Sequence, residues 1–244
     1  MSDFETVHRW LSEAERIAVL TGAGISRESG LPTFRGADGL WRQYRSEQLA
    51  SPAAFARDPR LVWEWYDWRR SVHATVEPNP GHHALVQLES RAAEFTLITQ
   101  NVDALHERAG SRRVLKLHGD LWTVRCTGCG VEAKNHDVPL KEIPPRCGCG
   151  GLLRPGVVWF GESLPEDVLR RAAAAARRAQ VFLFVGTSAL VQPAATLPLL
   201  AREAGARLVE INPEETPLTP LADASFRGPA GEILPRLVEA EVRQ

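Results

Sequence analysis

The four cysteines of this chain stand in two close pairs. Cys126 and Cys129 form CTGC, and Cys147 and Cys149 form CGC, with 17 residues between the pairs. In a reducing compartment, this pairing favours a metal ion over disulfides. Four thiolates complete a tetrahedral zinc shell and leave no open position for a catalytic water. The sequence therefore predicts one structural Zn²⁺. The C-x-C pair is tighter than the usual C-x-x-C, and four reduced buried cysteines are the weaker alternative.

Polar residues follow several apolar stretches. TGAGIS (21–26) ends the first such stretch, and its glycines let backbone N–H groups approach a pyrophosphate. The GAG triplet does not complete a dinucleotide fingerprint, so a tight structural turn explains it almost as well. TQNVDALH (99–106) places Gln100, Asn101 and Asp103 after a second stretch. Asn101 or Asp103 alternatively caps a helix starting at 104, which explains one residue but not all three.

Two later strand ends and one histidine add to this set. GTS (186–188) and Asn212 are suited to ribose hydroxyls or a base, although either is also ordinary loop chemistry. His118, in KLHGD, follows a further short strand. A histidine exchanges a proton near neutral pH, and its place at a strand end raises the case for catalysis over a structural role. Its competitors are His82, His83 and His106, and we expect the first two to pack or cap a helix.

VWEWYDWRR (62–70) combines aromatic surface with positive charge. Val62, Trp65 and Arg69 are spaced like one helix face, and Trp63, Tyr66 and Arg70 like another, so an ordinary half-buried helix accounts for the spacing.

The elements that must position these residues alternate along the chain. Helices are expected at 163–180, with a Ser163–Glu166 capping box, and at 193–205. Continuous apolar strands between helices predict a doubly wound α/β domain with a parallel sheet, whose ligands collect at the carboxyl ends of the strands. The predicted strands occupy 16–24, 95–101, 114–119, 181–188 and 207–212.

Two segments interrupt the alternation. Residues 36–80 carry four of the seven tryptophans and both tyrosines, and residues 123–154 carry the cysteines. We expect them to form a smaller helical and zinc-binding lobe, inserted into a large domain made of residues 1–35, 81–122 and 155–244.

Composition excludes several classes of protein. The 244 residues are 44% hydrophobic and 24% charged, with a formal net charge of −1, so neither nucleic acid nor a membrane is expected as a partner. No apolar run is long enough to span a bilayer, and MSDFETVHRW lacks the regions of a signal peptide. A cytoplasmic protein is expected. The sequence carries no signal for oligomeric state, and a monomer is favoured.

Taken together and in this order, these segments resemble the sirtuins, a family of NAD-dependent protein-lysine deacylases. The resemblance covers nearly the whole chain and is carried by GAGISRESGLPTFRG, TQNVDALHERAG, KLHGD, the paired cysteines, RPGVVWFGE, VGTS and IN. It implies a Rossmann-like large domain, a small lobe with zinc and helices, and a site between them where NAD meets an acyl-lysine protein substrate. The short termini then suggest a minimal catalytic core.

The resemblance also implies a role for individual residues. His118 matches the general base, and the four cysteines match the zinc ligands. The segment GVVWFGE (156–162) matches one that pairs with the substrate peptide like an added strand, through Val158, Trp159, Phe160 and Gly161. The expected NAD-binding residues are Gly22, Ala23, Gly24, Ser26, Thr33, Phe34, Arg35, Trp41, Gln100, Asn101, Asp103, Gly186, Thr187, Ser188, Asn212 and Ala230.

The implied reaction yields nicotinamide, O-acyl-ADP-ribose and free lysine. One sirtuin branch removes succinyl, malonyl or glutaryl groups and carries a Y-x-x-R pattern in its acyl pocket, which Tyr66 and Arg69 fill here. We therefore expect removal of acidic acyl groups together with acetyl, and expect Trp63, Trp65 and Trp68 to pack the helical lobe. The alternatives are a predominant deacetylase, a protein ADP-ribosyltransferase, and a zinc-ribbon nucleic-acid binder. The last is disfavoured because the cysteine module holds few positive charges.

Overall fold

The large domain is built on one parallel sheet of six strands. The computed structural model describes residues 3–34 and 46–239. In these residues the sheet runs in the order β3-β2-β1-β7-β8-β9, and every neighbouring pair is parallel. The doubly wound α/β prediction is confirmed, and each predicted strand is present, although it ends one to three residues earlier than predicted. The strands are β1 (Arg16–Thr21), β2 (Glu94–Thr99), β3 (Val114–Lys116), β7 (Val181–Val185), β8 (Arg207–Ile211) and β9 (Ala224–Phe226).

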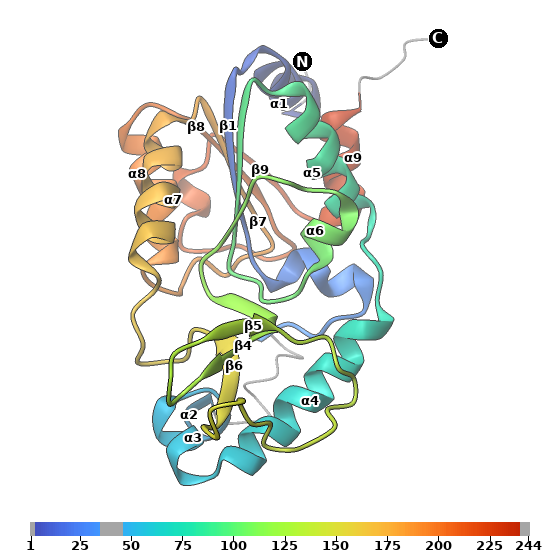
Figure 1. Ribbon diagram of the computed structural model, residues 1–244. Coiled ribbons are helices and arrows are strands. Elements are labelled where there is room, and N and C mark those ends of the chain that lie inside the picture. The colour runs from blue at the N-terminus through green and yellow to red at the C-terminus, as the bar shows by residue number, and fades with distance from the viewer. Residues whose placement is uncertain (1–2, 35–45, 240–244) are drawn as a thin grey trace.

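Helices cover both faces of this sheet (Figure 1). On one face pack α1 (Asp3–Glu13), α5 (Pro80–Arg91) and α9 (Ala230–Val238), and on the other α7 (Glu166–Arg178) and α8 (Leu197–Glu203). Successive side chains of a strand point to opposite faces, so Leu183 of β7 joins the first core while Phe182 and Phe184 join the second. This burial on both sides explains why the strands are continuously apolar.

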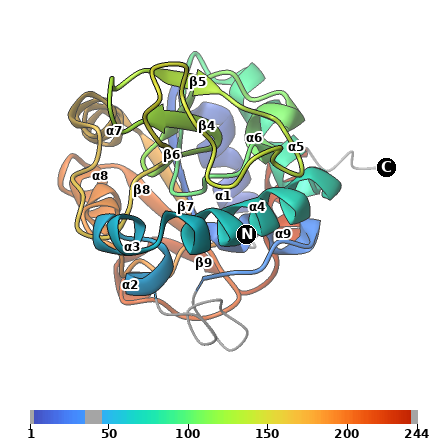
Figure 2. The same ribbon diagram turned by 60° about the horizontal axis from the view of Figure 1, so that its bottom comes forward.

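In its described residues, the small lobe combines the helices α2, α3 and α4 with an antiparallel sheet (Figures 1 and 2). Its sheet has the order β5-β4-β6 and extends a few residues beyond the expected 123–154 at each end, from Gly119 to Val157. Trp63 and Tyr66 pack with Leu121, Val124 and Trp159 in a core of its own. The elements are α2 (Ser46–Leu49), α3 (Pro52–Arg57), α4 (Pro59–Thr75), β4 (Gly119–Cys126), β5 (Glu132–Lys134) and β6 (Leu153–Val157).

The N-terminal cap predicted for the helix at 163–180 differs from the one observed. Helix α7 begins at Glu166 after Pro165, with no side chain capping it, so the Ser163–Glu166 capping box is wrong. Proline at this position directs the chain into the helix without a side-chain acceptor. The capping box occurs instead at α5, between Asn79 and His82, which confirms a capping role for His82.

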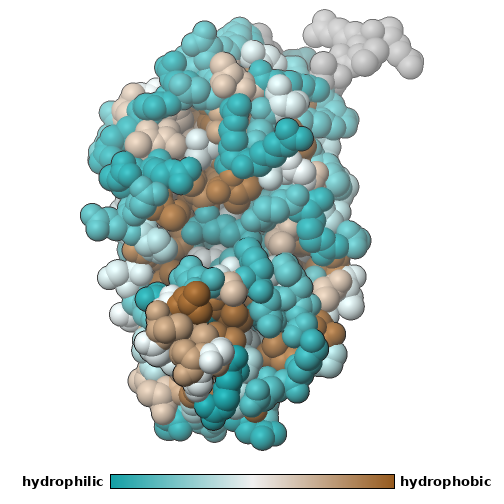
Figure 3. Space-filling model, viewed as in Figure 1, coloured by the Kyte–Doolittle hydropathy of each residue, from teal (hydrophilic) through white to brown (hydrophobic). Residues whose placement is uncertain are grey.

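The surface adds two facts. No helix among residues 3–34 and 46–239 has the length and apolar character needed to cross a membrane. Apolar residues nevertheless gather on the face shown in Figure 3, in one group on the large domain and in a second group on the small lobe.

Helix α4 is held against the small sheet by two polar side chains. The indole Nε1 of Trp63 donates to the carbonyl of Leu153 at 2.7 Å. Arg70 is fully buried, and its Nε and Nη2 donate to the carbonyl of Leu121 while Nη1 donates to Asn135 Oδ1. Burial lowers the pKa of Arg70 to about 10. The second arginine of VWEWYDWRR is therefore a structural residue that joins the helix to the sheet.

We expect Arg70→Met to lower the free energy of unfolding by about 3 kcal/mol, because it leaves the carbonyl of Leu121 and the side chain of Asn135 without the hydrogen bonds that Arg70 donates. Urea unfolding followed by tryptophan fluorescence measures this change. The matched control is Arg60→Met on the same helix, where an exposed arginine pairs with Glu64 and should contribute less than about 1 kcal/mol. Equal effects of the two substitutions would contradict this role for Arg70.

Candidate active site and zinc centre

The polar residues singled out from the sequence meet at the carboxyl edge of the parallel sheet. Gln100 follows β2, and its Nε2 donates to Oγ1 of Thr187, which follows β7, at 2.9 Å. Asn101 Nδ2 donates to the carbonyl of Gly22, which follows β1, at 3.1 Å. His118, two residues after β3, lies 2.9 Å from the Gln100 carbonyl through its Nδ1. Four strand ends thus contribute to one cluster.

The glycines of this edge are required by close packing of two turns. A Cβ on Gly24 would lie 2.6 Å from the Cα of Gly186, and a Cβ on Gly186 would lie 2.4 Å from the nitrogen of Ile25. Gly186 also has φ of +58°. The amides of Gly22 and Gly24 donate to the carbonyls of Val185 and Gly186, respectively, so neither of these N–H groups is open to a phosphate in this structure.

Beneath this turn, three buried polar side chains form a chain of hydrogen bonds. Asn101 Nδ2 donates to Ser26 Oγ at 3.3 Å, and Ser26 Oγ donates to Asp103 Oδ2 at 3.1 Å. The other oxygen of Asp103 accepts from the amide of Leu105 at 3.0 Å. Burial raises the pKa of Asp103, and these two hydrogen bonds partly offset the shift. Asp103 thus does bond the start of α6 (Leu105–Ala109), whereas Asn101 faces the cluster.

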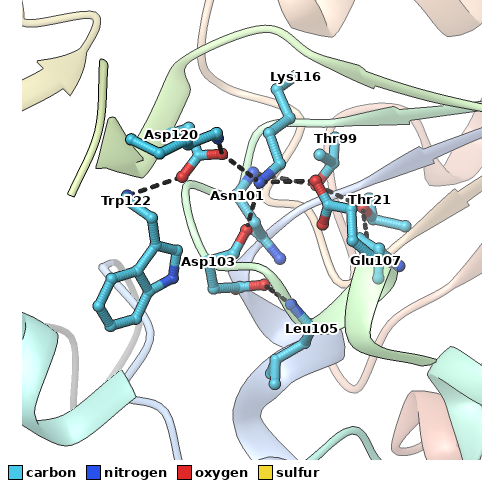
Figure 4. A network of polar contacts seen from close by, with 11 residues as sticks. Thr21, Thr99, Asn101, Asp103, Leu105, Glu107, Lys116, Asp120 and Trp122 are labelled. Carbon is cyan, nitrogen blue, oxygen red and sulfur yellow. Dashed lines mark hydrogen bonds and ion pairs between the residues drawn. The ribbon is translucent and has the colours of Figure 1, made fainter. Parts of the chain in front are cut away.

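Lys116 connects this loop to both lobes (Figure 4). Its ammonium donates to the carbonyl of Asp103 and to Asp120 of β4, and it pairs with Glu107 of α6 at 2.7 Å. Asp120 in turn accepts from Lys134 of β5. These contacts hold the pKa of Asp120 below its ordinary value despite its burial. A single cation therefore fixes the loop that carries Asn101 and Asp103 relative to the small sheet.

The ring of His118 has a fixed orientation. Because Nδ1 faces a carbonyl, Nδ1 must carry the hydrogen, and Nε2 of the neutral ring keeps its lone pair. Burial lowers the pKa of His118, although the bond to Gln100 opposes the shift. The backbone carbonyl of His118 accepts from the amide of Val158 at 2.9 Å. The geometry gives a neutral base directly beside the segment 158–161.

The backbone of the segment 158–161 is itself held in place by hydrogen bonds within the protein. The amides of Val158, Trp159 and Phe160 donate to His118, Glu162 and Ala50, respectively. Trp159 is buried and its Nε1 donates to the hydroxyl of Tyr66 at 3.0 Å, whereas Phe160 is 44% exposed. The N–H groups of these three residues are thus committed within the protein, and Gly161 adopts φ of +89° at the turn that follows.

Arg69 lies at an inner cavity between α4 and the cluster. Its guanidinium carbon is 4.9 Å from the ring centre of Trp65 and 5.1 Å from that of Phe34. Burial lowers the pKa of Arg69, and the nearby Tyr66 and Asp103 partly offset the shift. The cavity also contacts both the helix η1 (Ala23–Ser29) and the loop 101–103. Its lining residues are Ala23, Ser26, Leu31, Pro32, Phe34, Trp68, Arg69, Val72, His73, Asn101, Val102 and Asp103.

Other expected site residues lie at the margins of this cluster. Ser188 and Thr33 are half-buried, and Asn212 donates to the carbonyl of Glu214 in its own loop. Ala230 is buried at the start of α9, close to Gly81 of α5. Arg35 and Trp41 lie outside the described residues.

Several cavity residues were not anticipated from the sequence. Trp68 was expected to pack in the helical lobe, but it is 42% exposed and lines the cavity, because it lies one position away from the buried Trp65–Arg69 face. Val72 and His73 follow Arg69 at helical spacing of three and four, and that spacing was the available signal. No sequence pattern indicates the Lys116 network, because its members come from four separate elements.

The four cysteines form one compact group, as the spacing predicts. Their sulfur atoms all lie within 4.8 Å of one another, with 3.5 Å between Cys126 and Cys149 and 3.8 Å between Cys129 and Cys147. Four sulfurs around a tetrahedral zinc stand about 3.8 Å apart, so these residues fit the ion closely. An all-cysteine shell makes this a structural site, which joins the β4–β5 turn to the loop before β6.

Comparison with known proteins agrees with this arrangement. The model of the Sir2 family matches residues 22–193. An NAD-dependent protein deacylase of Aquifex aeolicus is 57% identical, over 91% of this chain and 94% of that protein, and NAD-dependent protein deacylase 2 of Pyrobaculum aerophilum is 54% identical over 96% and 94%.

Solved structures of Sir2 homologues superpose on the chain. One of them, a mutant in complex with ADP-ribose, has a TM-score of 0.94 at 53% identity and covers 98% of this chain and 95% of that one. A complex of a Sir2 homologue with NAD has a TM-score of 0.91 at 54% identity, over 96% and 92%.

We expect about one zinc ion per chain, measured by atomic absorption, and its loss in Cys129→Ala. Without the ion the small lobe loses its cross-link, so the free energy of unfolding should fall by at least about 3 kcal/mol. Thr127→Ala is the matched control, because this non-ligand in the same turn only donates a hydrogen bond to the Leu152 carbonyl. Full zinc content in Cys129→Ala would refute the four-thiolate site.

Proposed function

This chain belongs to the Sir2 family and is an NAD-dependent protein deacylase; we propose that it removes acidic acyl groups, succinyl and malonyl, from protein lysines, and acetyl groups as well. The observation that carries the acidic preference is Arg69. This buried cation touches aromatic rings at the inner cavity, and no carboxylate of the described residues forms an ion pair with it. The charge of Arg69 is desolvated, and only Tyr66 and the more distant Asp103 partly compensate for this, so an incoming carboxylate gains by pairing with it.

The neighbouring arginine supports this interpretation by contrast. Arg70 has its donors satisfied by Leu121 and Asn135, as expected of a structural residue. Arg69 has no such backbone partners among the described residues, and it faces the cavity instead. Two adjacent buried arginines on one helix thus differ in what completes their hydrogen bonds, and for Arg69 we propose that the substrate does.

Tyr66 offers a second donor to the same carboxylate. Its hydroxyl accepts from Trp159 Nε1, which leaves its own hydrogen available. Burial raises the pKa of Tyr66 above 10, so the phenol stays protonated at neutral pH and can donate. An acetyl group is too short to need either side chain, which is why we expect acetyl removal to persist beside the acidic activity.

The strand-end cluster fits NAD by its chemistry. Polar side chains of Gln100, Asn101 and Asp103 stand at the carboxyl edge of the sheet, where doubly wound folds bind nucleotides. Bound NAD supplies an electrophilic ribose carbon with nicotinamide as its leaving group. For the chain's own part, His118 accepts a proton at Nε2 from a ribose hydroxyl, while its Nδ1 bond to Gln100 keeps the ring oriented. Val158 and Phe160 flank the entering peptide.

For the acidic preference we expect Arg69→Met to lower kcat/KM for a succinyl-lysine peptide by about 10- to 100-fold, the effect of losing a charge-assisted hydrogen bond. The ratio of succinyl to acetyl removal, measured as nicotinamide release on matched peptides, isolates this effect. Arg60→Met on the exposed side of α4 is the control. If the ratio in Arg69→Met equals that of the unaltered protein, Arg69 is structural and the acidic preference argued from it is wrong.

For His118 we expect kcat/KM to fall on the acid side with an apparent pKa below 6.5. The base works only when neutral, and because burial lowers its pKa, activity should extend to lower pH than an exposed histidine would allow. His118→Ala should lose about 10²- to 10⁴-fold, whereas His83→Ala, an exposed histidine, should not. Residual activity in His118→Ala with the same acid limb would assign that limb to another group.

A further inference from the structure

His73 stands in the inner cavity with an unsatisfied polar atom. It lies one helical turn beyond Arg69 on α4 and lines the same cavity. Its Nδ1 is buried and has no hydrogen-bond partner in the part of the chain that the structure describes. A buried polar atom without a partner costs about 1–3 kcal/mol, so each such atom requires an explanation, such as a bound water, ion or ligand.

The place of His73 along α4 gives it a defined relation to the substrate. Tyr66, Arg69 and His73 follow at spacings of three and four, which puts them along one side of the helix. Tyr66 is bonded to Trp159, so this end of the row adjoins the segment 158–161 proposed to meet the peptide. His73 is seven residues further on, about 10 Å along the helix axis. It therefore faces the part of the cavity far from the peptide.

The charges around His73 favour the binding of an anion. Desolvation and the positive charge of Arg69 lower the pKa of His73 to about 3, so the ring is neutral and carries one N–H. The one carboxylate among the described lining residues, Asp103, already has both oxygens engaged, by Ser26 and by the amide of Leu105. The described part of the cavity thus offers a buried cation and a free imidazole nitrogen, but no unengaged carboxylate for them.

We propose that His73 is a second recognition residue for acidic acyl groups, which donates from Nδ1 to the terminal carboxylate and favours longer chains, glutaryl and succinyl, over malonyl. The inference rests on the proposed function, because it requires a carboxylate in the cavity. A malonyl carboxylate stays near Tyr66 and Arg69. Each added methylene carries the carboxylate further from the peptide, toward His73, where one oxygen can accept from Arg69 and the other from the imidazole.

Two variants of the whole chain separate this role from simple packing. His73→Leu keeps an apolar body of similar size and removes the donor, whereas His73→Gln keeps an N–H donor. The substrates are one peptide with acetyl-, malonyl-, succinyl- or glutaryl-lysine, and the readout is each acidic kcat/KM divided by the acetyl value of the same variant. A general loss of folded protein lowers all four rates and leaves these ratios unchanged.

In His73→Leu we expect the glutaryl ratio to fall about ten-fold, the succinyl ratio about three- to ten-fold and the malonyl ratio less than about two-fold, mainly through KM. His73→Gln should recover most of the loss. Equal glutaryl and malonyl ratios in His73→Leu, or a Gln variant no better than Leu, would overturn the inference. So would an altered inhibition by nicotinamide with unaltered acyl ratios, since His73 would then act on the nicotinamide product and not on the acyl group.

Arg69→Met distinguishes failure of this inference from failure of the proposed function. If Arg69→Met loses every acidic activity and His73→Leu loses none, acidic deacylation stands and the role of His73 is wrong. If the unaltered protein removes no acidic acyl group, the proposed function fails, and the inference about His73 fails with it. If Arg69→Met leaves all three acidic ratios unchanged, Arg69 does not bind the carboxylate, and the inference about His73, which places one oxygen on Arg69, is wrong.

Discussion

The constraint on which this structure depends is that a parallel sheet must be covered on both faces. Its strands are apolar throughout, and helices α1, α5 and α9 on one side and α7 and α8 on the other remove them from water. With both faces occupied, polar chemistry has room only at the strand ends. Thr21, Thr99 and Val185 are the last residues of three adjacent strands, and the groups that follow them meet within hydrogen-bond distance. The site is therefore a consequence of how the core is buried.

The inserted small lobe has to be fixed relative to this edge, and Lys116 provides the connection. Its ammonium touches the backbone of the loop that carries Asp103, Glu107 of α6, and Asp120 of the small sheet. The side chain is only 14% exposed, so these contacts are screened little by solvent. The second connection is the bond from Val158 to the backbone of His118. These two links connect His118, the loop 101–103 and the segment 158–161 to one another.

Helix α4 shows how identical side chains acquire different roles. Arg69 and Arg70 are both buried, but as consecutive residues of the helix, about 100° apart, they meet different partners. Arg70 meets the carbonyl of Leu121 and completes the small lobe, whereas Arg69 meets three aromatic rings and the inner cavity. The same turn brings His73 beside Arg69. This helix is thus a structural wall on one side and, in the function proposed here, the acyl-recognition surface on the other.

The sequence by itself determined the class of fold, the zinc ligands and most of the strand-end residues, because each depends on a local pattern. Apolar runs separated by helices specify a two-sided parallel sheet, and two close cysteine pairs specify a tetrahedral ion. Only the tertiary structure decided which residues share the inner cavity and that Trp68 is one of them. It also decided that Ser163 does not cap α7, and that the amides of Gly22 and Gly24 donate to the carbonyls of Val185 and Gly186. Such outcomes depend on contacts between residues far apart in the chain, whose partners no local spacing reveals.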